Sequence, residues 1–261
     1  ANERPYDDEI DPQVYESVAV ETMYLPLLYG NVLHLLSLQI GEKRQDDFET
    51  GLELFERHYE WQREELELAQ VYPTMLALYQ LLGKDGKTKE TRYRGNARHL
   101  TKFDPNKITL PRDLSNLAWN AAWDMLFLMR LNDYRTGEVL RWSGKPASHI
   151  PAVLISKDYD PEWLSLTVNP IGEFFVADDS TSLPLFESAS DFFDPYHTMD
   201  VNKKHEVYSR LNKIKRTHPR KSMDNEELSS HVIPAIHELE DRLGIERTRF
   251  PEYDEHFPKA L

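Results

Sequence analysis

The residues best suited to chemistry lie on a mostly apolar segment in the middle of the chain. Asp113, Asn116, Asn120 and Asp124 are spaced three and four residues apart. At about 100° per residue they fall on one arc of a helix. Polar groups on a buried helix need hydrogen bonds, a cation or a wet cleft. The spacing therefore predicts either a functional stripe or a structural one, in which Asp113 caps the helix and the others bond to neighbouring groups.

Two further acids follow apolar runs typical of strands. Glu21 ends the run Ser17-Val-Ala-Val-Glu21, and Asp158 ends the run Pro151-Ala-Val-Leu-Ile-Ser-Lys-Asp158. The carboxyl ends of parallel strands border the crevice where ligands bind. Glu21, Asp124 and Asp158 are therefore the expected ligands of Mg²⁺ or Mn²⁺, supported by Asp113 and Asn120. Such a metal would activate a water for attack on a phosphodiester.

The order of these elements resembles the PIN-like nuclease family over residues 15–165. The stretch Val18-Ala-Val-Glu-Thr-Met23 is similar to the family's opening strand, with Glu where Asp is usual and Met where Asn is common. Asp124 (or Asp113) and Asp158 look like the later acids, whereas the segment from Tyr72 to Tyr79, where the mid-chain acid belongs, contains no carboxylate. The resemblance implies metal-dependent hydrolysis of RNA, or a relative that has lost catalysis and kept binding.

Basic residues gather in two segments of an otherwise acidic chain. The net charge of −14 disfavours a protein that coats nucleic acid by bulk electrostatics. Residues 84–102 and 200–221 nevertheless form locally basic stretches. Their members Arg92, Arg94, Arg98, Lys203 and Lys204 are candidates for contact with RNA phosphates. The alternative is two solvated faces that balance acidic neighbours.

The residues alone leave two alternatives to a metal-dependent nuclease. The stretch Arg94-Gly-Asn-Ala-Arg-His99 resembles the arginine and histidine motif of the HEPN ribonucleases, which implies a histidine general base without a metal. Here it falls in a segment, residues 84–106, that we expect to be a polar loop. The other alternative is a non-enzymatic, protein-binding or regulatory module. It would use the long charged helix that begins at Asp47 and the C-terminal helices as partner surfaces.

Periodicity predicts the elements that position these groups. Apolar residues at helical spacing predict helices over residues 25–38, 47–70 and 113–131, and Pro73 and Gly83 bound a further helix. We expect strands at residues 17–21, 151–158 and 173–177, a basic helix at 202–215, and a helix from Asp224 to Gly244 that Pro234 breaks or kinks. His34 is expected to be a hydrogen-bonded core histidine.

These elements predict an α/β, helix-rich fold. We expect a PIN-like unit over residues 1–198, with a short, mostly parallel central sheet flanked by helices, and a helical C-terminal extension over residues 199–261. The chain contains no cysteine and opens on an acidic stretch without the basic and apolar regions of a secretion signal. Polar residues interrupt its most apolar segments, so we expect a cytoplasmic protein without a membrane span.

Overall fold

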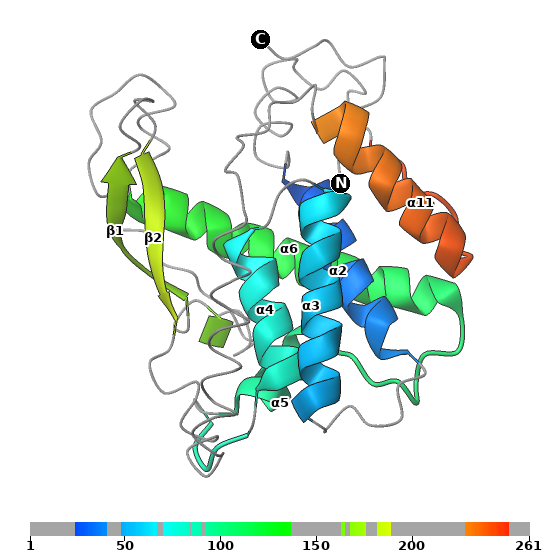
Figure 1. Ribbon diagram of the computed structural model, residues 1–261, viewed down its shortest axis with the longest axis horizontal. Coiled ribbons are helices and arrows are strands. Elements are labelled where there is room, and N and C mark those ends of the chain that lie inside the picture. The colour runs from blue at the N-terminus through cyan, green and yellow to red at the C-terminus, as the bar shows by residue number, and fades with distance from the viewer. Residues whose placement is uncertain are drawn as a thin grey trace, which may run out of the picture.

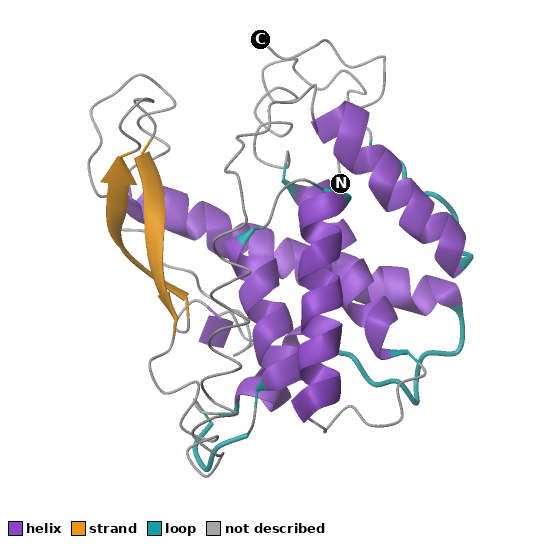
Figure 2. Ribbon diagram, viewed as in Figure 1, coloured by secondary structure: helices purple, strands orange, loops and turns teal. Residues whose placement is uncertain are grey.

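The computed structural model describes residues 24–40, 48–66, 70–83, 85–89, 92–136, 163–164, 168–175, 182–188 and 228–250. Within these ranges the chain forms helices and one pair of strands (Figures 1 and 2). The longer elements are α2 (Leu25–Gln39), α3 (Phe48–Glu64), α4 (Val71–Leu82), α5 (Tyr93–Thr101), α6 (Pro111–Thr136), β1 (Val168–Phe175), β2 (Ser182–Ser188) and α11 (Ile233–Leu243).

Helix α2 lies at the centre of the helical part. It packs against α3, α4, α6 and α11, and almost all of its side chains are buried. Its sequence is apolar around the whole helix, which is the pattern of a helix covered on every side. Pro26 lies in its first turn, where a missing N–H removes no helical hydrogen bond. The predicted helix at residues 25–38 is therefore confirmed.

Helices α3 and α4 pack closely beside each other. Leu52, Phe55 and Tyr59 recur at helical spacing on the buried face of α3. Gly51 makes the close approach possible, since a Cβ at this position would lie 2.4 Å from the carbonyl oxygen of Leu81 on α4. The predicted α3 is confirmed as a helix, although it ends at Glu64 and not near residue 70. Helix α4 ends before Gly83, as predicted.

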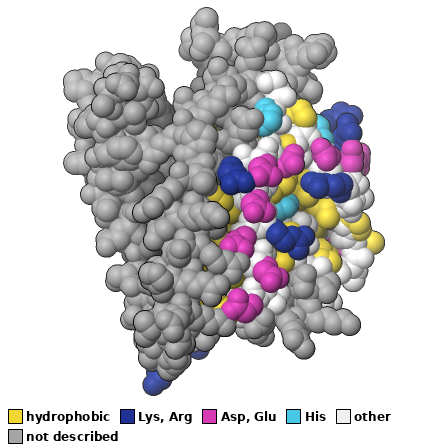
Figure 3. All heavy atoms as spheres, in the orientation of Figure 1, with side chains coloured by type: hydrophobic (Ala, Val, Ile, Leu, Met, Phe, Trp, Pro, Cys, Tyr) yellow, Lys and Arg dark blue, Asp and Glu magenta, His cyan; other side chains and the backbone are white. Residues whose placement is uncertain are grey.

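The outward face of α3 is strongly acidic. Four glutamates on this helix are exposed: Glu49, Glu53, Glu60 and Glu64. Figure 3 shows acidic side chains gathered along the face of the molecule that α3 occupies in Figure 1. The prediction of a helix with one face in the core and one charged face in solvent is therefore confirmed.

The predicted central parallel sheet is wrong for the described part of the chain. β1 and β2 form a two-stranded antiparallel pair, with Val168 opposite Ser188 and Phe175 opposite Ser182. Only residues 176–181 connect the two strands, and a parallel pair needs a crossover of about a dozen residues or more. The strand expected at residues 173–177 thus exists in part, as one arm of a hairpin. The strands expected at 17–21 and 151–158 lie outside the described residues.

The C-terminal helix begins with a break in regular geometry. A π-helical turn, Leu228–Val232, precedes α11, and Pro234 lies in the first turn of α11, so the predicted break is confirmed. Gly244 ends the helix with a φ of 69°, the left-handed conformation that glycine adopts without strain.

Helix α11 comes very close to α2. A Cβ on Gly30 of α2 would lie 2.7 Å from Cγ1 of Ile236, whose side chain is fully buried. The predicted domain division at residue 198 stays a prediction, because residues 189–227, including the expected basic helix at 202–215, lie outside the described residues. No helix in the described ranges is long and apolar enough to cross a membrane.

Candidate functional site

Helix α6 buries a face that combines small and large apolar residues. Ala118, Ala121 and Ala122 are fully buried, together with Met125. Helix α6 packs along α2 on this side. Alanines let two helix backbones approach each other closely, because they add little volume at the contact. Leu114 and Leu128 are buried with the alanines, so this side of α6 belongs to the core.

The outward face of α6 carries five exposed side chains, which we call the α6 strip: Arg112, Asn116, Asn120, Trp123 and Phe127. At about 100° per residue, all five project within an arc of about 80°. The strip contains one cation, two amides and two aromatic rings, and no carboxylate. The strip therefore differs from the outward face of α3, which carries exposed glutamates.

Trp123 and Phe127 form an exposed aromatic pair within the strip. Their ring centroids lie 5.9 Å apart, and the ring planes are tilted by 34°. Trp123 is 39% exposed and Phe127 54% exposed. Single exposed apolar residues are common, but two large aromatic side chains that contact each other at the surface leave a contiguous apolar patch in water. This aromatic pair is therefore a candidate contact surface for another molecule.

The polar stripe predicted for this helix does not face a buried cleft. Asn116 and Asn120 are exposed, and Asp124 is half-buried. Oδ2 of Asp113 accepts hydrogen bonds from the N–H groups of Leu110 at 2.9 Å and Thr109 at 3.0 Å. These bonds, that from Leu110 above all, hold the pKa of the Asp113 carboxyl below its usual range. The structural alternative for Asp113 is confirmed, because its carboxylate secures the start of α6.

The expected metal site cannot be assembled from the described residues. Glu21 and Asp158 lie outside them, so the three-carboxylate site of Glu21, Asp124 and Asp158 stays a prediction. Among the residues that the structure describes, no group of three or more His, Asp or Glu side chains lies close enough to hold a metal ion.

The segment predicted to be a polar loop contains α5 instead. Tyr93, Ala97 and Leu100 have helical spacing and are fully buried. Gly95 and Asn96 hide this pattern, because both residues have low helix propensity. The motif from Arg94 to His99 therefore lies on a helix, and the premise that it lies in a loop is wrong.

The helical setting does not bring the two motif residues together. Arg94 and His99 are five residues apart, so their side chains leave α5 in directions about 140° apart. The Arg94 guanidinium donates a hydrogen bond to the carbonyl oxygen of Leu81 at 3.2 Å, whereas His99 is exposed. A general base and its arginine need to point at one reacting group. Of the other predicted RNA contacts, Arg92 is exposed, Arg98 is half-buried, and Lys203 and Lys204 lie outside the described residues.

A buried chain of polar side chains joins α4, α3 and α2. Oγ1 of Thr74 donates to Oε1 of Gln62 at 3.0 Å. Nε2 of Gln62 donates to Oδ1 of Asn31 and to Nε2 of His58, the latter at 3.2 Å. Nδ1 of His58 lies 3.0 Å from Nδ1 of His34. The prediction that His34 is a hydrogen-bonded core histidine is therefore confirmed. These hydrogen bonds hold the three helices in place relative to one another.

The hydrogen bonds between these side chains also determine the tautomers of both histidines. An amide nitrogen only donates, so Nε2 of His58 accepts from Gln62 and the His58 proton lies on Nδ1. His58 then donates this proton to Nδ1 of His34, whose own proton lies on Nε2. Burial lowers the pKa of His58 to about 3. Burial, with the nearby His58, Arg242 and Arg57, lowers the pKa of His34 to about 2. Both rings are therefore neutral in the folded protein at pH 5 and above.

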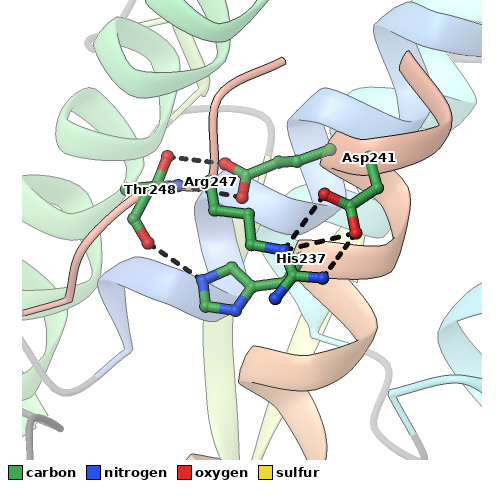
Figure 4. A network of polar contacts seen from close by, with 5 residues as sticks. His237, Asp241, Arg247 and Thr248 are labelled. Carbon is green, nitrogen blue, oxygen red and sulfur yellow. Dashed lines mark hydrogen bonds and ion pairs between the residues drawn. The ribbon is translucent and has the colours of Figure 1, made fainter. Parts of the chain in front are cut away.

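A second buried network anchors α11 to the helices around α2. Tyr29 donates to Oε1 of Glu240 at 2.7 Å, and its hydroxyl lies 3.0 Å from Oγ of Ser115 on α6. Burial above all raises the pKa of Tyr29. The Glu240 side chain is fully buried and also accepts from the backbone N–H and the hydroxyl of Thr248, at 3.0 and 2.5 Å. Figure 4 shows the contacts around Thr248, where His237 faces the carbonyl oxygen of this residue.

Three residues in these networks were not among the predicted site residues. His58 and Gln62 lie four residues apart on the buried face of α3, and Glu240 lies between the apolar residues Leu239 and Leu243 of α11. Polar residues at apolar positions of a helical pattern are the signal that could have found them. Because their hydrogen bonds link helices to one another, we assign the two networks to the stability of the fold, and the α6 strip is the candidate functional site.

Comparisons with known proteins assign neither a family nor a fold to this chain. No family model matches it, no curated protein matches it, and no solved structure matches it. The case for its function therefore depends on the physical features of the described residues.

Proposed function

We propose that this chain is a protein-binding module whose contact surface is the α6 strip. The exposed pair of Trp123 and Phe127 carries this proposal. Aromatic residues and arginine are enriched at the centres of protein interfaces, whereas Lys, Glu and Asp are depleted there. The strip has this composition, with Arg112, two aromatic rings and no acid.

The polar members of the strip suit the same purpose. Asn116 and Asn120 each offer two donors and one acceptor, and their exposed amides can exchange water for partner groups without stranding a buried charge. Together with Trp123 and Phe127, they give an apolar centre beside polar groups, as in most protein interfaces. The acidic face of α3, by contrast, is of the kind that stays solvated, because burying its glutamates would require a matching cation for each.

A site-specific photo-crosslinker tests this proposal. We would place it at Trp123 and, as a matched control, at Glu53, which is also exposed on a helix but lies on the acidic face of α3. We expect a discrete protein adduct from position 123 alone. An excess of wild-type protein without the crosslinker should suppress this adduct, whereas an excess of the Trp123→Glu/Phe127→Glu protein should not. Equal adducts from both positions, or equal competition by both proteins, would contradict a specific contact.

An RNA cleavage assay on the purified wild-type protein distinguishes binding from catalysis. The proposed binding module needs no metal, whereas the predicted nuclease needs Mn²⁺ or Mg²⁺ held by Asp124 and two acids outside the described residues. We expect single-stranded RNA to stay intact with Mn²⁺ at high protein concentration. Cleavage that the Asp124→Asn change abolishes would replace our proposal with the metal-dependent nuclease.

A further inference from the structure

We infer that the partner of the α6 strip is a second copy of this chain, bound with its α6 antiparallel to the first. The inference rests on the proposed function and names its partner. It follows from the order of residues along the strip. Arg112 and Phe127 lie equally far from the point between Trp119 and Asn120, and so do Asn116 and Trp123. Four of the five strip positions are therefore symmetric about this point, with unlike side chains at the paired positions, and Asn120 lies next to the point itself.

A two-fold axis through this centre brings complementary groups together. In an isologous contact, residue i of one copy meets residue j of the other, and j meets i. Arg112 then faces Phe127 of the second copy, where a guanidinium over a ring gains a cation–π attraction. Asn116 faces Trp123 of the second copy, whose indole N–H can donate to the amide oxygen. Asn120 lies beside the axis, where two amides can exchange hydrogen bonds with each other.

Electrostatics also favour this face over the others. Two copies that each carry a net charge of −14 repel each other over most of their surfaces. The α6 strip itself carries one positive charge, and the carboxylates that border it, Asp113 and Asp124, are half-buried, so this surface repels a second copy less than the acidic face of α3 does. The opposite holds for the outward face of α3, where exposed glutamates such as Glu53 and Glu60 would face one another.

The size of the contact sets its strength. The strip spans a rise of about 22 Å along α6, from Arg112 to Phe127. A contact of a single helix with its copy buries less than the roughly 1,200 Å² at the low end of stable complexes. We therefore expect a reversible dimer whose population rises with concentration, and not an obligate one.

Sedimentation velocity on the full chain, from low to high micromolar concentration, measures this equilibrium. We expect the sedimentation coefficient to rise with concentration in the wild type and in the control Glu53→Gln, and to stay at the monomer value in Phe127→Lys, where a cation would face Arg112 of the second copy. Arg112→Glu/Phe127→Lys restores a pairing of opposite charge and should restore the dimer. A wild type that stays monomeric, or a dimer that Phe127→Lys leaves intact, overturns the inference.

The absence of cysteine provides a second, geometric test. Asn120→Cys places a single thiol beside the axis, so mild oxidation should link two copies through it. Arg57→Cys on α3 is the matched exposed control and should stay monomeric. Equal linkage of both variants overturns the inference, because it would reflect random collisions.

The two proposals fail in different ways. A monomeric wild type whose crosslinker at Trp123 still captures a different protein, with competition as described above, overturns the second copy and leaves the binding module standing. A monomeric wild type whose Trp123 position captures nothing overturns both.

Discussion

The neutral pair of His34 and His58 makes the stability of this protein sensitive to mild acid. Both side chains are buried, and their pKa values in the folded protein lie at about 2 and about 3. In the unfolded chain each returns to about 6.5. The unfolded state therefore binds more protons than the folded state as the pH falls below 6.5, so acid favours unfolding. The stabilisation is fully present above this pH and is lost progressively below it.

The size of the effect follows from the difference in pKa. At pH 5 the unfolded chain gains about 2 kcal/mol from protonation of each histidine, while the folded rings stay neutral. The pair should therefore lower the free energy of unfolding by about 4 kcal/mol between pH 8 and pH 5. The free energy of unfolding of a typical domain is about 5 to 15 kcal/mol in total. Carboxylates contribute little over this interval, because their unfolded pKa values are about 4.

Urea unfolding at a series of pH values from 8 to 5 measures this loss. The double variant His34→Gln/His58→Gln should show a much shallower dependence on pH, whatever its stability at pH 8. The matched control His99→Gln removes an exposed histidine and should retain the slope of the wild type.

Two results would refute the reasoning. The first is an equal slope in the wild type and the double variant. The second needs no variant: an NMR titration of the folded wild type in which either buried imidazole gains a proton near pH 6.5.

Three further changes test the contacts that hold the helices together. Tyr29→Phe removes a donor to the buried carboxylate on α11 and should lower the free energy of unfolding by about 1 to 2 kcal/mol, measured by urea unfolding. Gly51→Ala adds a methyl group 2.4 Å from the carbonyl oxygen of Leu81 and should cost about 1 to 3 kcal/mol in the same assay, whereas Glu53→Ala on the exposed face of α3 should have little effect. Asp113→Ala removes the acceptor at the start of α6 and should lower the melting temperature, by the same amount with and without Mg²⁺; a loss of stability seen only with Mg²⁺ would instead indicate a metal ligand.

The helices were predictable where apolar residues recur at helical spacing and a clear signal ends the pattern. Gly83 and Gly244 end α4 and α11 as expected, and Pro234 marks the break before α11. α5 was missed because Gly95 and Asn96 weaken its pattern, although Tyr93 and Leu100 anchor it in the core. Burial of these two residues contributes more than the local propensity costs.

The sheet was the larger error. Short apolar runs with β-branched residues predict strands but not their partners, because pairing depends on contacts between distant parts of the chain. The interpretation as a parallel sheet came from the expected strands at 17–21 and 151–158. The pair described by the structure is instead local, between residues 168 and 188, and a short connection makes such a pair antiparallel.

Residue spacing alone predicts a helix over residues 113–131 with polar residues along one arc, because spacing along a helix fixes which side chains share a face. It could not determine which face is outward, because α6 also carries apolar residues on almost every side. Contact with α2 settles which side is buried, because Tyr29 of α2 lies within hydrogen-bond distance of Ser115 and stacks on Trp119. This packing leaves Trp123, Phe127 and Asn120 in solvent, because they project from another face of the helix.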